Sequence, residues 1–86
     1  MKPAGLVYPC EFPVKLFIRP DAAVEQRLES LVRSHLDAGA PLTVERRSSA
    51  KGNYLCLTLV FVARSEDHLL RITQAVREDP GVVLSL

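Results

Sequence analysis

A polar turn that runs directly into a long apolar segment constrains the fold of this chain more than any other feature. The turn covers residues 49–54 (SAKGNY), and residues 55–63 (LCLTLVFVA) follow it. Gly and Asn are typical of the turn in a β-hairpin. Alternation in the second segment places its largest residues on one face: Leu55, Leu57, Leu59 and Phe61. We therefore expect a hairpin whose second strand, residues 54–63, lies in the middle of a sheet.

Three other segments are predicted to be strands: residues 14–19 (VKLFIR), 42–47 (LTVERR) and 82–86 (VVLSL). The first two alternate apolar and polar residues, and a period of two is typical of strands. The segment 42–47 is the more polar of these two, which favours an edge position. Residues 1–13 are rich in proline and are expected to form an irregular N-terminal arm.

Two segments have the spacing of amphipathic helices. The first begins after Asp21, a favourable N-cap, and ends before Gly39 and Pro41. Its predicted apolar stripe is Val24, Leu28, Leu31, Val32 and His35. The second begins after Ser65 and ends at residues 79–81 (DPG). Its predicted stripe is Leu69, Ile72, Thr73 and Val76.

The order of these segments is strand, helix, strand, strand, helix, strand. Because strand–helix–strand crossovers are right-handed, this order favours a four-stranded antiparallel sheet in the order 4-1-3-2 with both helices on one face. The predicted class is therefore α+β, and the predicted architecture is a ferredoxin-like sandwich. The core residues expected from the strands are Val14, Leu16, Ile18, Leu42, Val44, Leu55, Leu57, Leu59, Phe61, Val82 and Leu84.

The length of 86 residues fits one small domain, residues 1–86. Hydrophobic residues make up 48% of the chain, which is enough for a core and argues against disorder. No apolar run reaches the length of about 18 residues that a membrane span needs. The N-terminal apolar stretch is too short and too interrupted by proline to resemble a signal peptide. The cytoplasm is therefore the expected location.

One face of the predicted sheet has no helix over it and carries many apolar residues. The candidate interface on this face consists of Phe17, Val60, Val62 and Val83. Exposed apolar clusters of this size are usually covered by something. The candidate covers are a second copy in a homodimer, a partner, or apolar residues of the chain's own arm: Leu6, Val7, Tyr8 and Phe12.

Two motifs resemble those of a known family. Residues 9–15 (PCEFPVK) lead into the first strand, and residues 51–54 (KGNY) lead into the third. They resemble the paired signatures of the small bacterial YbeD-like proteins, which also have a similar length and element order. Ala50 stands where the family pattern usually has Ser, and Arg19 and Pro20 stand where many members have a small residue or Gly. The resemblance implies a fold close to the ACT regulatory domain, a cytosolic protein and a remote link to lipoate metabolism.

An ACT-like fold implies a regulatory or ligand-sensing module. Such domains bind small molecules at the turn between the first strand and the first helix, often across a dimer interface. Here this turn contains Arg19 and Asp21, which could meet a carboxylate and an amine. A helix cap explains Asp21 equally well, and a solvated strand end explains Arg19.

The turn at residues 51–54 is the best local candidate for a site. The most specific hypothesis is a small anion or carboxylate between Lys15, Lys51 and Tyr54, because Lys15 is expected on the same face, one strand away. Gly52 and Asn53 belong to this candidate site. Their tolerance of positive φ also explains them as parts of a tight turn without any ligand.

Nucleic-acid binding is the alternative function, and composition disfavours it. The net charge is +1, from 11 basic and 10 acidic residues, whereas nucleic-acid binders need a basic surplus. RNA-recognition domains place aromatic residues where this chain has Asn53 and Leu55. Arg46, Arg47 and Lys51 still form a basic hairpin, which could serve an adaptor that binds nucleic acid or protein.

No enzymatic activity, metal site or cofactor is expected. The sequence shows no carboxylate pair, no nucleophile with a base, and no metal-ligand spacing. Pro20 removes a backbone donor from the loop that cradles phosphate in acylphosphatases of the same topology. His35 and His68 are expected to be structural. Cys10 and Cys56 are expected to be ordinary thiols in a reducing compartment.

Overall fold

The computed structural model describes residues 6–85 and contains the predicted elements in the predicted order. They are β1 (Cys10–Ile18), α1 (Ala22–Arg33), β2 (Leu42–Ser48), β3 (Leu55–Ala63), α2 (Glu66–Arg77) and β4 (Val82–Ser85). The strands form one antiparallel sheet in the order β2-β3-β1-β4, which is the predicted order 4-1-3-2 read from the other edge. The ferredoxin-like α+β fold is therefore confirmed.

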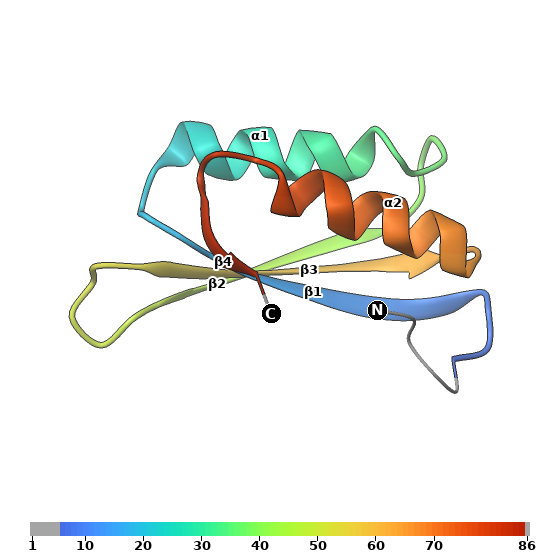
Figure 1. The fold of residues 1–86 in the computed structure, drawn as a ribbon, viewed down its shortest axis with the longest axis horizontal. Coiled ribbons are helices and arrows are strands. Elements are labelled where there is room, and N and C mark those ends of the chain that lie inside the picture. Colours follow the sequence, from blue (N-terminus) through green and yellow to red (C-terminus); the bar gives the residue numbers. More distant parts are fainter. Residues whose placement is uncertain (1–5, 86) are drawn as a thin grey trace.

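Both helices lie on the same face of the sheet, as the sequence predicts (Figure 1). The opposite face carries no helix. The turn between β2 and β3 extends past the helices at one end of the sheet (Figure 1). The hairpin and the helix-free face are therefore the parts of the fold that are open to a ligand or partner.

The helices begin at the capping residues that the sequence indicates. The Asp21 carboxylate accepts hydrogen bonds from backbone N–H groups of the first turn of α1, at 2.9 and 3.4 Å. Ser65 Oγ accepts one from the backbone N–H of His68 at 3.1 Å. Since α1 ends at Arg33, His35 lies beyond the helix and not on its apolar stripe. Neither of these 12-residue helices has the length and apolar character that a membrane span requires.

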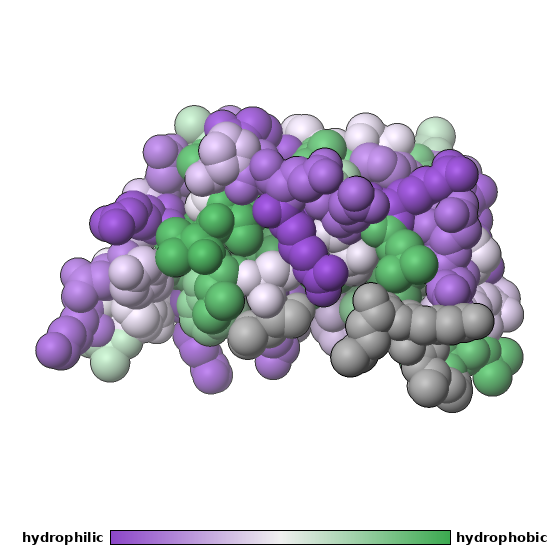
Figure 2. Space-filling view, viewed as in Figure 1, coloured by the Kyte–Doolittle hydropathy of each residue, from purple (hydrophilic) through white to green (hydrophobic). Residues whose placement is uncertain are grey.

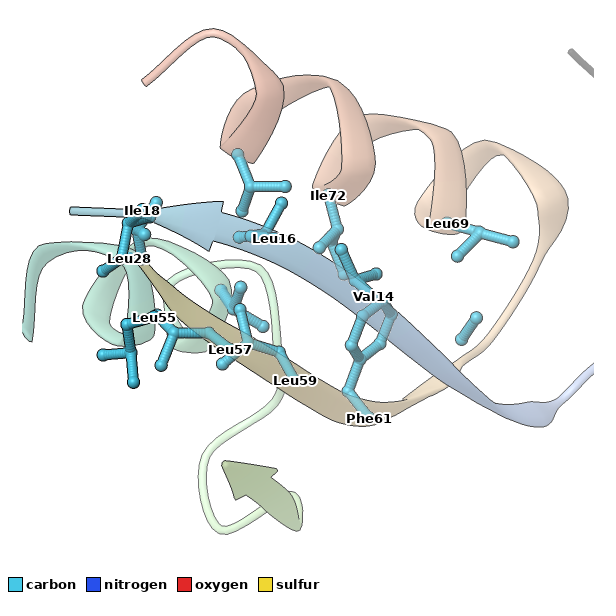
Figure 3. Close-up of a cluster of buried hydrophobic side chains, with 13 residues drawn as sticks. Val14, Leu16, Ile18, Leu28, Leu55, Leu57, Leu59, Phe61, Leu69 and Ile72 are labelled. Carbon is cyan, nitrogen blue, oxygen red and sulfur yellow. The ribbon is translucent and has the colours of Figure 1, made fainter. Parts of the chain in front are cut away.

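The core lies between the helices and the face of the sheet that they cover. β1 pairs with β3 along its whole length, so that Leu16 lies opposite Leu57. Side chains at alternate positions of both strands point toward the helices (Figure 3). The buried apolar residues are Val14, Leu16, Ile18, Leu28, Val32, Leu55, Leu57, Leu59, Phe61, Ala63, Leu69, Ile72 and Val76. Leu42, Val44 and Val82 pack against this cluster but are only half-buried, because they lie on the outer strands.

The prediction that Leu84 belongs to the core is wrong. β4 pairs with β1 through Val82 opposite Ile18 and Leu84 opposite Phe17, so Val83 is an extra residue in the ladder. An extra residue shifts the alternation of a strand by one position. Leu84 therefore lies opposite Phe17, which is not a core position, and it is 53% exposed, as is Val83. Figure 2 shows apolar surface at the position of β4.

The N-terminal arm is shorter than predicted. β1 begins at Cys10, so the expectation of irregular structure is wrong for residues 10–13. Proline is tolerated at the edge of a sheet because no neighbouring strand needs its missing N–H group. Pro13 fits this rule, since β4 pairs with β1 only from Leu16 onward. The part of the predicted arm at residues 1–5 lies outside the described residues.

The apolar residues of the arm that were candidates to cover the open sheet face do not cover it. Phe12 lies opposite the buried Phe61, on the helix side of the sheet. Leu6 and Tyr8 pack against the core cluster. Val7 is 81% exposed. None of the described residues 6–85 therefore covers the helix-free face.

Candidate functional site

The helix-free face, called the open face below, has a row of polar side chains across its middle. Lys15 of β1 lies opposite Thr58 of β3, and Thr58 lies opposite Glu45 of β2. Neighbouring strands are about 4.8 Å apart, so the backbones of Lys15 and Glu45 are separated by about 10 Å. The row therefore carries a positive charge at one end and a negative charge at the other.

The next row, nearer to the β2–β3 turn, combines aromatic, thiol and basic side chains. Phe17 lies opposite Cys56, and Cys56 lies opposite Arg47. Leu84 extends this row on the other side of Phe17. Phe17 and Cys56 are half-buried, whereas Arg47 is exposed. The row therefore places a cation beside apolar surface.

The far end of the open face is more apolar. Val60 lies between Pro13 and Thr43, and Val62 lies opposite Glu11. Both valines are half-buried. The predicted interface residues Phe17, Val60 and Val62 therefore share this face. Val83 is the exception, because it is the extra residue at the irregularity of β4.

Two adjoining depressions hollow the open face near the hairpin. One has a volume of about 580 Å³ and the other of about 250 Å³. Lys15, Arg47 and Cys56 line both of them, so they form one continuous feature, which we call the Lys15–Arg47 trough. Its other lining residues are Phe17, Glu45, Arg46, Ser48, Ser49, Tyr54 and Thr58.

Lys15 and Arg47 have no hydrogen-bonded or ionic partner within residues 6–85. This distinguishes Arg47 from the other arginines. Their partners are Tyr54 for Arg19, Asp79 for Arg27, Glu29 for Arg33, Glu25 for Arg46, Asp37 for Arg64, Asp67 for Arg71 and Ser85 for Arg77. A free guanidinium can donate two parallel hydrogen bonds to a carboxylate. The trough therefore holds two cations that are available to an anion.

The β2–β3 turn is held by contacts of its own residues. The backbone N–H of Ser49 donates to the carbonyl of Tyr54 at 2.9 Å, and Ser49 Oγ accepts from the N–H of Tyr54 at 3.1 Å. Gly52 donates to the Ser49 carbonyl at 2.9 Å and has a φ of +71°, which favours glycine. Asn53 does not need a positive φ. Lys51 and Asn53 are exposed in the turn, and neither lines the trough.

Arg19 and Tyr54 form one contact at the hairpin end of the trough. The guanidinium carbon of Arg19 lies 5.9 Å from the centre of the Tyr54 ring, within the range of a cation–π interaction. The Asp21 carboxylate caps α1. The structure thus uses both charged residues of the β1–α1 turn in local contacts. Of the predicted site residues, Lys15 and Tyr54 lie in the trough, whereas Lys51 does not.

Arg47 and Cys56 were not predicted as residues of the small-ligand site, although Arg47 was assigned to the basic hairpin. The register of the hairpin holds the missing signal: because Ser48 lies opposite Leu55, Arg47 must lie opposite Cys56. Because side chains alternate along a strand, Arg46 and Arg47 lie on opposite faces of the sheet. The Arg46 guanidinium is bound by Glu25 of α1, with Nε to Oε1 at 2.5 Å. The expected basic hairpin thus has one of its cations neutralised.

A third depression, of about 400 Å³, lies at the N-terminus of α2. It is lined by His35, Arg64, Ser65, Asp67, His68 and Arg71. His68 Nδ1 accepts a hydrogen bond from the backbone N–H of Arg64 at 3.0 Å, so the proton is on Nε2, which donates to the carbonyl of His35 at 2.7 Å. Both ring nitrogens are therefore occupied. Among residues 6–85, no group of three or more His, Cys, Asp or Glu residues is arranged to hold a metal ion.

Residues 4–86 match the model of a family described as "Protein of unknown function (DUF493)". The chain belongs to this family. A relative from Nitrosomonas europaea, a UPF0250 protein, is 34% identical over 79 residues, which are 92% of this chain and 91% of the relative. A UPF0250 protein from Leptothrix cholodnii is 38% identical over 82 residues, covering 92% of this chain and 87% of the relative. These matches confirm the resemblance to the small bacterial YbeD-like proteins.

A solved structure supports the same fold. The solution structure of protein HP0495 from H. pylori aligns with a TM-score of 0.79 and covers 99% of this chain and 89% of that chain. Its sequence identity is 18%, so the similarity concerns the fold alone.

Proposed function

We propose that this chain is a non-enzymatic binding module that takes a carboxylate group in the Lys15–Arg47 trough. The observation that carries the proposal is that Lys15 and Arg47, two cations in a trough on the open face, have no partner among the described residues 6–85. Most arginines of this chain have their charge matched by an acidic side chain. A binding site is the simplest reason to keep two cations unmatched in one depression.

The lining of the trough narrows the class of ligand. Arg47 would bind the carboxylate through two parallel hydrogen bonds, and Lys15 would add a second positive charge. Phe17 and Tyr54 offer apolar surface to the rest of the ligand. Glu45, two positions from Arg47 on the same face of β2, would repel a second negative charge. We infer a monocarboxylate with an apolar body, or an amino acid whose ammonium group meets Glu45.

The regulatory part of the proposal rests on the resemblance to ACT-like domains, which sense small molecules. Lipoate is included because the resemblance to the YbeD-like proteins implies a remote link to lipoate metabolism, and it is a monocarboxylate with an apolar chain. We infer that the module acts in the cytosol, because the resemblance to the YbeD-like proteins implies a cytosolic protein. Retention of the protein in the cytosolic fraction of a native bacterial cell would test this location.

Nucleic-acid binding is less well supported. The ion pair between Arg46 and Glu25 removes a cation from the hairpin, and Glu45 places a negative charge in the trough. A phosphate backbone favours surfaces of uniformly positive charge. Retention of the protein on RNA or DNA at low salt, lost at high salt, would favour this alternative over the carboxylate site.

Titration of isotopically labelled protein with free amino acids, octanoate and lipoate, followed by NMR, tests the proposal. Binding is expected to shift the backbone amide signals of Lys15, Arg47 and Cys56. Arg47→Gln should remove the response, and Lys51→Gln, which removes a cation outside the trough, should preserve it. If no compound shifts these signals, or if both variants lose the response equally, the proposal is wrong.

A further inference from the structure

We propose that, in the absence of a ligand, a second copy of this chain covers the open face around a twofold axis parallel to β3. The face needs an occupant from outside the described chain, because the apolar residues of the arm lie elsewhere. The proposal concerns the same surface as the proposed function, but it does not depend on a carboxylate ligand. The two proposals can therefore fail separately.

Charge complementarity is the first argument. A twofold axis that runs along β3, over Thr58, exchanges the positions of β1 and β2 between the copies. Because Lys15 and Glu45 are the two ends of one row, Lys15 then faces Glu45 of the partner subunit. Symmetry repeats the contact in the opposite direction. The charges at both ends of the row are thus matched in one arrangement.

The other rows of the open face fit the same axis. Val60 and Val62 belong to β3, so each faces the same residue of the partner subunit. The apolar ends of the two open faces therefore meet. Arg47 faces Phe17 of the partner subunit, a pairing suited to a cation–π contact. Cys56 also lies on β3, next to the axis. Sheets that pack face to face are about 10 Å apart with strands within about 30° of each other, so these contacts are within reach.

An axis across the strands satisfies only part of this pattern. Centred on the middle row, it places Lys15 over Lys15 of the partner subunit. An axis across the strands can also lie midway between the row of Glu45 and the row of Arg47. This axis pairs Glu45 with Arg47 of the partner subunit, but it places Val60 and Val62 over the polar hairpin turn. Only the axis parallel to β3 matches the charged row and the apolar end together.

A charge-reversal experiment by analytical ultracentrifugation in ligand-free buffer tests the arrangement. The wild-type chain should form a dimer between micromolar and millimolar concentration. Lys15→Glu and Glu45→Lys should each weaken association about tenfold or more, because each places like charges together twice. An equimolar mixture of the two variants should associate again, since both of its charge pairs are attractive. Circular dichroism confirms beforehand that both variants are folded, as expected for exposed positions.

The expected cross-link provides an independent measurement. A short bis-maleimide reagent should join two chains through Cys56 in the wild type. Cys10→Ser should leave this product unchanged, because Cys10 lies opposite the buried Ala63 on the helix side of the sheet. Cys56→Ser should abolish it. A chain that is monomeric throughout the concentration range overturns the proposal. A mixture of the charge variants that fails to associate overturns it too.

Discussion

Arg27 donates paired hydrogen bonds to Asp79, from Nε to Oδ2 at 2.8 Å and from Nη2 to Oδ1 at 2.6 Å. The pair joins α1 to the turn between α2 and β4. The Asp79 side chain is only 6% exposed, and its Oδ1 also accepts the backbone N–H of Gly81 at 2.8 Å. The hydrogen bonds from Arg27 are the main reason that the pKa of Asp79 is lowered from its ordinary value of 3.8.

Asp79→Asn is expected to lower the stability of the fold and to reduce its dependence on acidic pH. Because the pKa of Asp79 is lower in the folded chain than in the unfolded one, its ionised form stabilises the fold at pH values above the ordinary pKa. This stabilisation disappears as the pH falls through the lowered folded value. Urea unfolding at a series of pH values should show a loss of about 1–3 kcal/mol at neutral pH and a smaller loss in acid.

Asp37→Asn is the matched control for this measurement. Asp37 pairs with Arg64 at 3.6 Å, but its side chain is 73% exposed. Exposed ion pairs contribute little to stability, so this substitution should change the unfolding free energy only slightly at any pH. Equal effects of the two substitutions would contradict the role assigned to Asp79.

Gly81→Ala is expected to destabilise the chain through a steric clash. A Cβ atom at this position would lie 2.6 Å from Cγ1 of Val24 on α1. Valine has one strongly preferred rotamer in a helix, so its side chain cannot turn away easily. The expected cost is about 1–3 kcal/mol in thermal or urea unfolding. The same substitution in a Val24→Ala background should cost clearly less, and an unchanged cost would mean that the clash is not its cause.

His68→Ala is expected to destabilise the chain by about 2 kcal/mol or more. It removes the acceptor of the Arg64 N–H and the donor to the His35 carbonyl, and both backbone groups lose a partner. His35→Ala retains that carbonyl and serves as the comparison. Urea unfolding should give the larger loss for His68→Ala; a larger loss for His35→Ala would show that the backbone contacts are unimportant.

Leu84→Ala is expected to change the stability of the monomer by less than about 0.5 kcal/mol, because this side chain is 53% exposed. Leu16→Ala should cost about 2–5 kcal/mol, because Leu16 is fully buried. The two substitutions remove the same atoms, so unfolding curves recorded at low protein concentration compare burial directly. Similar losses would place Leu84 in the core after all.

Most of the fold can be predicted from patterns between residues that are close in the sequence. The alternation in β1 and β3 places their large residues on one face, and Asp21 and Ser65 cap the helices where the sequence indicates. These features depend on neighbours along the chain, so a single sequence reveals them. The order of the strands follows from the order of the elements and from the handedness of crossovers.

The errors concern features that depend on contacts between distant segments. The position of Leu84 depends on an extra residue in β4, which only its pairing with β1 reveals. Pro13 suggests an irregular segment by its local preference, but it lies in β1 because that edge has no neighbour there. Arg47 becomes a site residue only when the partners of the other arginines are known. The sequence shows no periodic pattern that indicates which arginine pairs with which acidic residue.

β4 pairs with β1 over a short length, and this affects the motions of the chain. Among the described residues, β4 pairs with β1 between Leu16 and Ile18, whereas β1 and β3 are joined over nine residues. The C-terminal segment should therefore detach from the sheet long before the centre opens, and its amides should exchange with deuterium first. Each detachment of β4 exposes the backbone hydrogen-bonding groups on the outer edge of β1 near Phe17. During these openings, another strand could pair with β1 in the place of β4.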